Sequence, residues 1–82
     1  MAHALLPHNA LSTEIAQKVF LKFGEEKFIA THANREYPSF QNYVHKFLAE
    51  KVLIRHQRGT PHQPAIYQFS PKAVMVMRRR LN

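Results

Sequence analysis

The side chains best suited to binding another molecule lie between residues 38 and 64, and most of them are amides or cations. At about 100° per residue, a helix starting near Pro38 presents a polar face made of Ser39, Asn42, Lys46 and Ala49, with only one acid, Glu50, near it. Asn42 can form two hydrogen bonds with an adenine edge, and Gln41 can do so if the helix rotates toward it. Lys46 can reach a guanine edge or a phosphate. This face therefore predicts binding to a nucleic acid.

Tyr43 and His45 flank this face. Ser39 and Tyr43 suit phosphate contacts near the N-terminus of a helix, where backbone N–H groups also point outward. Each flanking residue has a plainer interpretation as well, because Tyr43 fits a half-buried position and His45 fits an ordinary helix edge. Both are kept as candidate contacts.

A second group of candidates lies in the polar segment 55–64. Arg55 and Arg58 can neutralise phosphates, and Arg58 beside Gly59 can enter a narrow minor groove. Thr60 completes this group. The spacing predicts a basic turn between two strands.

Charge is distributed unevenly along the chain, which has 12 Lys and Arg against 5 Asp and Glu and a net charge of +7. All five acids lie in residues 1–50, which also hold five Lys and Arg, so the excess comes from residues 51–82. That excess includes three adjacent possible phosphate contacts, Arg78, Arg79 and Arg80. A basic half joined to a neutral half is typical of a polyanion-binding face, and a solubility charge and a solvated tail are the alternatives.

Other chemistries find little support. The chain has no cysteine and no aspartate, and its six histidines include no His-x-x-x-His pair, so we expect no metal and no cofactor. The two glycines, Gly24 and Gly59, form no phosphate-binding loop. We therefore expect that the protein is not an enzyme.

The elements that position these residues follow from apolar spacing and from helix caps. Ser12 is the expected N-cap of a helix that begins at Thr13 and stops at Gly24, after an arm over residues 1–10. Residues 25–33 fit a helix ending near Asn34, or a short strand at 27–30 that pairs with the later hairpin. Tyr37 marks a break because it precedes a proline.

A helix, a strand and a returning strand follow this break. Ser39 is expected to help cap the helix, whose buried stripe is Phe40, Val44, Phe47 and Leu48. Residues 52–54 predict a strand entry, and the strand at 65–69 alternates with Ala65, Tyr67 and Phe69 on one face.

The last part of the chain favours self-association. Ser70 and Pro71 predict another helix start, and residues 73–77 are apolar on every side. We expect a homodimer to which this segment contributes. The predicted organisation is an arm (1–10), a domain (11–72) and an apolar, basic C-terminal segment (73–82).

This order of elements resembles a winged helix-turn-helix domain over residues 11–72. Residues 47–55, FLAEKVLIR, look like the exit from the recognition helix of that superfamily. The basic turn and residues 64–69, PAIYQF, are similar to the wing and returning strand of small bacterial regulators. The resemblance implies an α+β fold with three helices, a two- to three-stranded β wing and a short C-terminal segment. Only residues 25–37 separate the first helix from the recognition helix, so the second helix must be short or begin almost at once.

The resemblance implies that the helix after Pro38 enters the major groove of double-stranded DNA while the wing reaches the neighbouring backbone or minor groove. We expect a small transcriptional regulator of bacterial, plasmid or phage type that acts by occupying an operator. The alternative is a winged-helix module that binds a protein partner within a larger nucleoprotein or regulatory complex. No apolar run approaches the ~20 residues that span a bilayer, so we expect a cytoplasmic protein that joins the nucleoid when bound to DNA.

Overall fold

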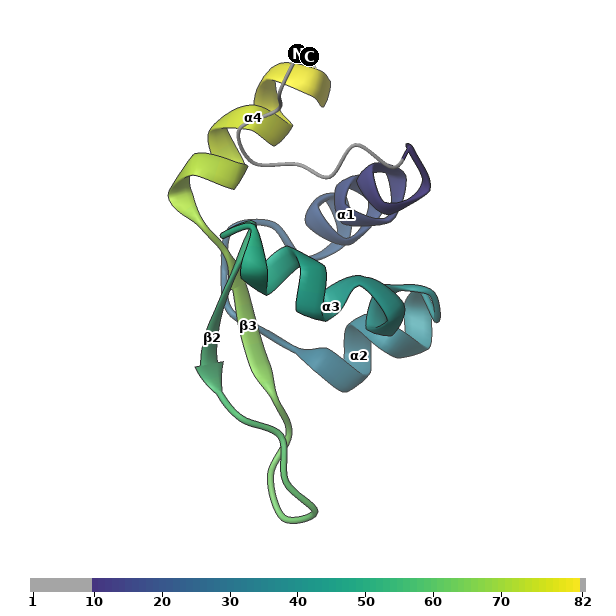
Figure 1. Cartoon of the computed structure of the whole chain (residues 1–82), viewed down its shortest axis with the longest axis vertical. Coiled ribbons are helices and arrows are strands. Elements are labelled where there is room, and N and C mark those ends of the chain that lie inside the picture. Colours follow the sequence, from purple (N-terminus) through teal and green to yellow (C-terminus); the bar gives the residue numbers. More distant parts are fainter. Residues whose placement is uncertain (1–9, 82) are drawn as a thin grey trace.

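Four helices and one three-stranded antiparallel sheet make up the computed structural model, which describes residues 10–81 (Figure 1). In chain order the elements are α1 (Ala10–Phe23), β1 (Phe28–Ile29), α2 (Ala30–Glu36), α3 (Phe40–Ala49), β2 (Leu53–Gln57), β3 (Ile66–Phe69) and α4 (Pro71–Leu81). The predicted α+β class is therefore confirmed. Apart from Ala10, the arm predicted for residues 1–10 lies outside the described residues.

The sheet has the order β1-β3-β2, so its earliest strand pairs with its last one. Phe28 pairs with Tyr67, and the backbone N–H of Ala30 donates to the carbonyl of Ala65 at 2.9 Å. Of the two alternatives for residues 25–33, the short strand is found at Phe28–Ile29, and a helix follows it directly. The predicted stop at Asn34 is wrong, because α2 continues to Glu36.

Strand β2 is longer than predicted. Residues 55–57, assigned to the polar turn by sequence, belong to β2, where Arg55 pairs with Tyr67 and Gln57 with Ile66. The reason is that a strand is held by backbone pairing with its neighbour, which polar side chains do not prevent. The turn is therefore confined to residues 58–65.

The helix ends test the predicted caps. Gly24 follows α1 with φ +71° and donates to the carbonyl of Phe20, as expected of a C-terminal glycine. The predicted cap at Ser12 is wrong, because α1 begins at Ala10 and this small side chain is fully buried inside the helix. Ser39 precedes α3 but sits in the helical region itself and makes no side-chain cap bond, so this expectation is also wrong. Ser70 caps α4, since its Oγ accepts from the N–H of Ala73 at 3.1 Å.

An aromatic cluster holds the helices against the sheet. The ring of Phe28 lies 6.0 Å from Phe40, 5.8 Å from Phe69 and 6.4 Å from Tyr67, measured between centroids. Phe40 and Phe47 are fully buried, and their rings lie 6.1 Å apart. Burying a phenylalanine stabilises a fold by about 1.5–3 kcal/mol. These two residues therefore fix both ends of α3 in the core.

The molecule is elongated, with extents of 41 × 21 × 21 Å. Helices α1, α2 and α3 gather in the middle, while the β2–β3 hairpin and α4 project to opposite ends of the long axis (Figure 1). No helix within residues 10–81 is both long enough and apolar enough to cross a membrane.

Candidate functional site

Helix α3 presents the polar face predicted from its spacing. With Phe40 and Phe47 buried, the residues exposed on the other side are Gln41, Asn42, His45, Lys46 and Ala49. Gln41 is therefore exposed without any rotation of the helix. Ser39 and Tyr43 are half-buried, and the Tyr43 ring lies 6.1 Å from that of Phe47. Tyr43 thus contributes to packing, which was its plainer interpretation.

The exit from α3 is fixed by an unusual backbone turn. Lys51 has φ +63°, a region that residues other than glycine seldom adopt. The Ser70 hydroxyl donates to the Lys51 carbonyl at 2.7 Å, and the N–H of Val52 donates to the Phe47 carbonyl at 2.8 Å. These bonds set the angle between α3 and β2.

The loop between β2 and β3 is internally braced. Thr60 and Gln63 exchange backbone hydrogen bonds of 2.8 and 3.3 Å, and the Thr60 hydroxyl accepts from the N–H of Gln63 at 3.1 Å. The Gln63 side chain donates to the carbonyl of Arg58. A Cβ at Gly59 would lie 3.3 Å from that of Ala65, so glycine allows the two limbs of the loop to approach closely.

Cations on α3 and the hairpin have no acidic partner. Lys46, Arg55 and Arg58 are exposed, and none of them forms an ion pair with another residue of the described chain. Arg78 differs, because it pairs with Glu25 and so ties α4 to the turn after α1. Arg79 and Arg80 are exposed in the last turn of α4.

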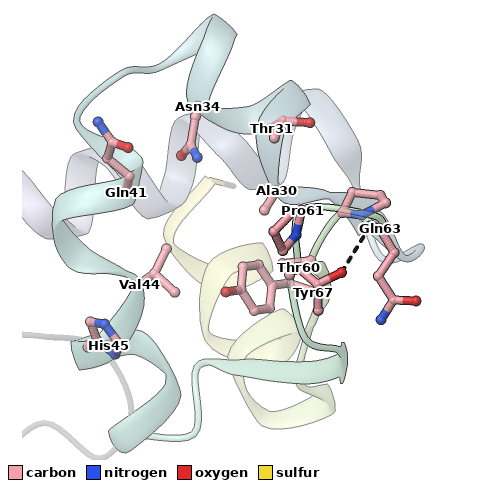
Figure 2. A pocket seen from close by; sticks show the side chains of 13 residues that line it. Ala30, Thr31, Asn34, Gln41, Val44, His45, Thr60, Pro61, Gln63 and Tyr67 are labelled. Carbon is pink, nitrogen blue, oxygen red and sulfur yellow. Dashed lines mark hydrogen bonds between the residues drawn. The ribbon is translucent and has the colours of Figure 1, made fainter.

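A groove of about 510 Å³ lies where α2, α3 and the β2–β3 loop meet. Its helical walls are formed by Ala30, Thr31, Asn34, Gln41, Val44 and His45 (Figure 2). The remaining wall is formed by residues 59–61 and 63–65 together with Tyr67.

The groove unites only part of the predicted site. It brings together four of the candidate contacts, Gln41, His45, Gly59 and Thr60. The other six candidates on α3 and the hairpin do not line it. Sequence reasoning missed Thr31, Asn34 and Gln63, which no local signal marks, because they reach the groove only through tertiary packing.

The lining of the groove is uncharged. Among the described residues that form it there is no Lys, Arg, Asp or Glu, although the chain carries a net charge of +7. Amides and hydroxyls alternate with apolar side chains. Two arginines adjoin the lining along the backbone, since Arg58 precedes Gly59 and Arg55 pairs across the sheet with Tyr67.

Asn34 holds an unusual polar atom in this groove. Its side chain points from α2 into the space beside α3 (Figure 2). The Oδ1 atom is buried and has no hydrogen-bond partner among residues 10–81. A buried acceptor without a donor costs stability, so the amide is a local weak point of the fold.

The histidines of the described residues, His32, His45, His56 and His62, do not gather into a metal site. His56 Nε2 lies 2.7 Å from Gln68 Oε1, and the backbone N–H of His62 in the loop donates to the Thr60 hydroxyl. Within the described part of the chain no group of three His, Asp or Glu residues is placed to hold a metal ion.

Comparison with known proteins gives no relative: no family model, no curated protein and no solved structure matches the chain.

Proposed function

We propose that this protein is a winged helix-turn-helix regulator that binds double-stranded DNA and acts by occupying an operator. The element order supports the proposal, since α3 is followed by the β2–β3 hairpin that would serve as the wing. Residues 28–36 hold both a short strand and a short helix, the two elements that the superfamily usually has in this interval. Helix α3 would enter the major groove, which is wide enough for a helix.

One observation carries the proposal: the exposed face of α3 is rich in amides, carries Lys46 and contains no acid. Asn42 on this face can read an adenine edge. Arg55 and Arg58 on the adjacent hairpin form no ion pair within residues 10–81 and would neutralise phosphates. Affinity would then come mainly from the hairpin and specificity from α3.

A protein-binding module is the weaker alternative. Such a helix would present an apolar or aromatic anchor at its centre. The large apolar residues that are exposed in the described chain are Leu11, Leu21, Ile54 and Met75, and none of them lies on α3. The exposed face of α3 therefore fits nucleic acid better than a protein partner.

A homodimer remains part of the proposal, with a smaller contact than the sequence suggested. Ala73, Val74 and Met77, expected to supply that contact, are buried within one chain. Met75 is 59% exposed and Val76 is half-buried. The surface of α4 that would pair with a second copy is therefore centred on Met75.

The first test uses fluorescence anisotropy to measure the affinity of the protein for a random-sequence duplex of about 30 base pairs over a series of salt concentrations. We expect a log–log slope of about −4 or steeper, which corresponds to roughly five neutralised phosphates. Absence of binding at low salt would reject the proposal. Lys46→Ala should weaken binding, while Lys18→Ala, on α1 and paired with Glu14, serves as the matched control.

A further inference from the structure

The groove between α2, α3 and the β2–β3 loop has no Lys, Arg, Asp or Glu among the described residues of its lining, and the backbones of Arg55 and Arg58 adjoin that lining at Tyr67 and Gly59. We propose that it binds one unpaired nucleotide, with the base inside the groove and the phosphate on Arg55 and Arg58. A nucleotide matches this arrangement, because its base is neutral and its phosphate carries the negative charge.

The interior suits a base in both shape and chemistry. Val44 and Pro61 approach the space from α3 and from the loop, and offer apolar contact to the faces of a flat ring (Figure 2). Gln41 and Asn34 place side-chain amides at its edge (Figure 2). Amides pair with base edges through one donor and one acceptor. The volume of about 510 Å³ lies within the range of small-molecule sites.

Preorganisation of the loop favours this use. Gln63 donates through Nε2 to the carbonyl of Arg58, which braces the loop. Because the Thr60–Gln63 turn is already hydrogen-bonded, binding would order few additional groups. The orphaned Oδ1 of Asn34 adds a reason, since a rotation of this amide toward a base N–H would provide the missing donor.

The phosphate would lie on the hairpin. Arg55 stands opposite Tyr67 in the sheet, and directly paired residues project from the same face, which here is the face that lines the groove. Arg58 adjoins Gly59 in the lining. Neither arginine is paired with an acid of the described chain, so both guanidinium groups can bind an anion.

A base within a duplex would not fit, because its faces are covered by its stacked neighbours. The nucleotide is therefore either free in solution or part of a single-stranded or looped-out segment. The bases of a duplex would be contacted elsewhere on α3, since at 100° per residue Asn42 and Lys46 lie on the far flank of α3 from Val44. Arg55 and Arg58 would serve the phosphates in both cases.

The test is a titration of the full ¹⁵N-labelled chain, in which two-dimensional NMR measures the shifts of its backbone amide signals. The probes are AMP, adenosine, inorganic phosphate and a thymidine hexanucleotide. We expect AMP to shift the signals of Gly59, Thr60, Gln63, Gln41 and His45, which line the groove. We also expect it to bind about tenfold more tightly than adenosine, the effect of one charge-assisted contact. Higher affinity for the hexanucleotide than for AMP would identify a nucleotide within a single strand as the ligand. Higher affinity for AMP would identify a free nucleotide as the ligand.

Three variants make the assignment specific. Asn34→Leu should weaken AMP binding through loss of the amide, and Arg55→Gln should weaken it through loss of the phosphate contact, each by about tenfold. Arg35→Gln removes an exposed cation of α2 that does not line the groove and should leave AMP affinity within about twofold. Arg55→Gln alters only an exposed side chain, so its effect on AMP affinity tests the inference even if Asn34→Leu perturbs the fold.

Two results would overturn the inference. One is absence of shifts in the groove with AMP and hexanucleotide at about 10 mM, a concentration that reveals even millimolar binding. The other is equal weakening by Arg35→Gln and Arg55→Gln, which would mean diffuse attraction to a basic surface. Neither result tests Asn42 or Lys46 on α3, whose contribution to duplex binding the anisotropy experiment measures separately.

Discussion

Replacing Asn34 by leucine should make the protein more stable. The Oδ1 atom of this amide is buried without a partner among residues 10–81, and an unsatisfied buried polar group costs about 1–3 kcal/mol. Leucine has a similar size and a higher helix propensity, which adds about 0.5 kcal/mol within α2. The groove beside this position gives the new side chain space. We therefore expect stabilisation of about 1–3 kcal/mol.

Urea denaturation followed by circular dichroism measures this change. With a slope near 1 kcal/mol/M for a chain this small, the midpoint should rise by about 1–3 M while the slope stays constant. Asn42→Leu is the matched control, because it makes the same exchange in a helix at an exposed position. Its stability should rise only by the helix-propensity term of about 0.5 kcal/mol.

A loss of stability in Asn34→Leu larger than about 1 kcal/mol would refute the reasoning, because it would mean that the amide has a native partner. If Asn34→Leu gains stability and loses AMP binding, the native asparagine favours binding at the expense of fold stability.

Three further predictions use other parts of the fold. Ser70→Ala should destabilise the domain by about 2 kcal/mol, measured by urea denaturation, because its hydroxyl both caps α4 and bonds the Lys51 carbonyl; a change below about 0.5 kcal/mol would contradict this role. Lys46→Ala should weaken duplex binding and reduce the salt slope by about one unit, measured by anisotropy; an unchanged slope and site preference would remove α3 from the interface. Met75→Glu should convert the proposed dimer to a monomer in analytical ultracentrifugation, whereas Leu21→Glu, equally exposed but on α1, should not.

Local signals in the sequence were enough for much of the fold. The spacing of Phe40 and Phe47 predicted the buried stripe of α3, and the alternation of Tyr67 and Phe69 predicted the inward face of β3. Gly24 marked the end of α1 because its positive φ is a local requirement. Each of these features depends on neighbours within a few residues, which is the range that periodicity and caps describe.

Other features depend on distant partners and could not be predicted in the same way. Strand β1 has only two residues, and its existence rests on pairing with Tyr67 and Ile66 nearly forty positions later. The extension of β2 through polar residues has the same origin. The groove is the extreme case, because Asn34 and Gln63 lie far apart in sequence and meet only when α2 and the loop are in place. The exposed residues of α3 could be predicted from their spacing, whereas the groove beside them could not.

The hydroxyl of Ser70 has a consequence for how the domain can move. It accepts from the first turn of α4 and donates to Lys51 at the exit of α3, so one oxygen joins the two helices on either side of the β2–β3 hairpin. A swing of α4 that kept its cap would break the bond from Ser70 to the Lys51 carbonyl, beside the left-handed turn at Lys51. Ser70 therefore links the orientation of α4 to that of α3. A molecule that binds α3 meets a surface whose orientation depends in part on the position of α4.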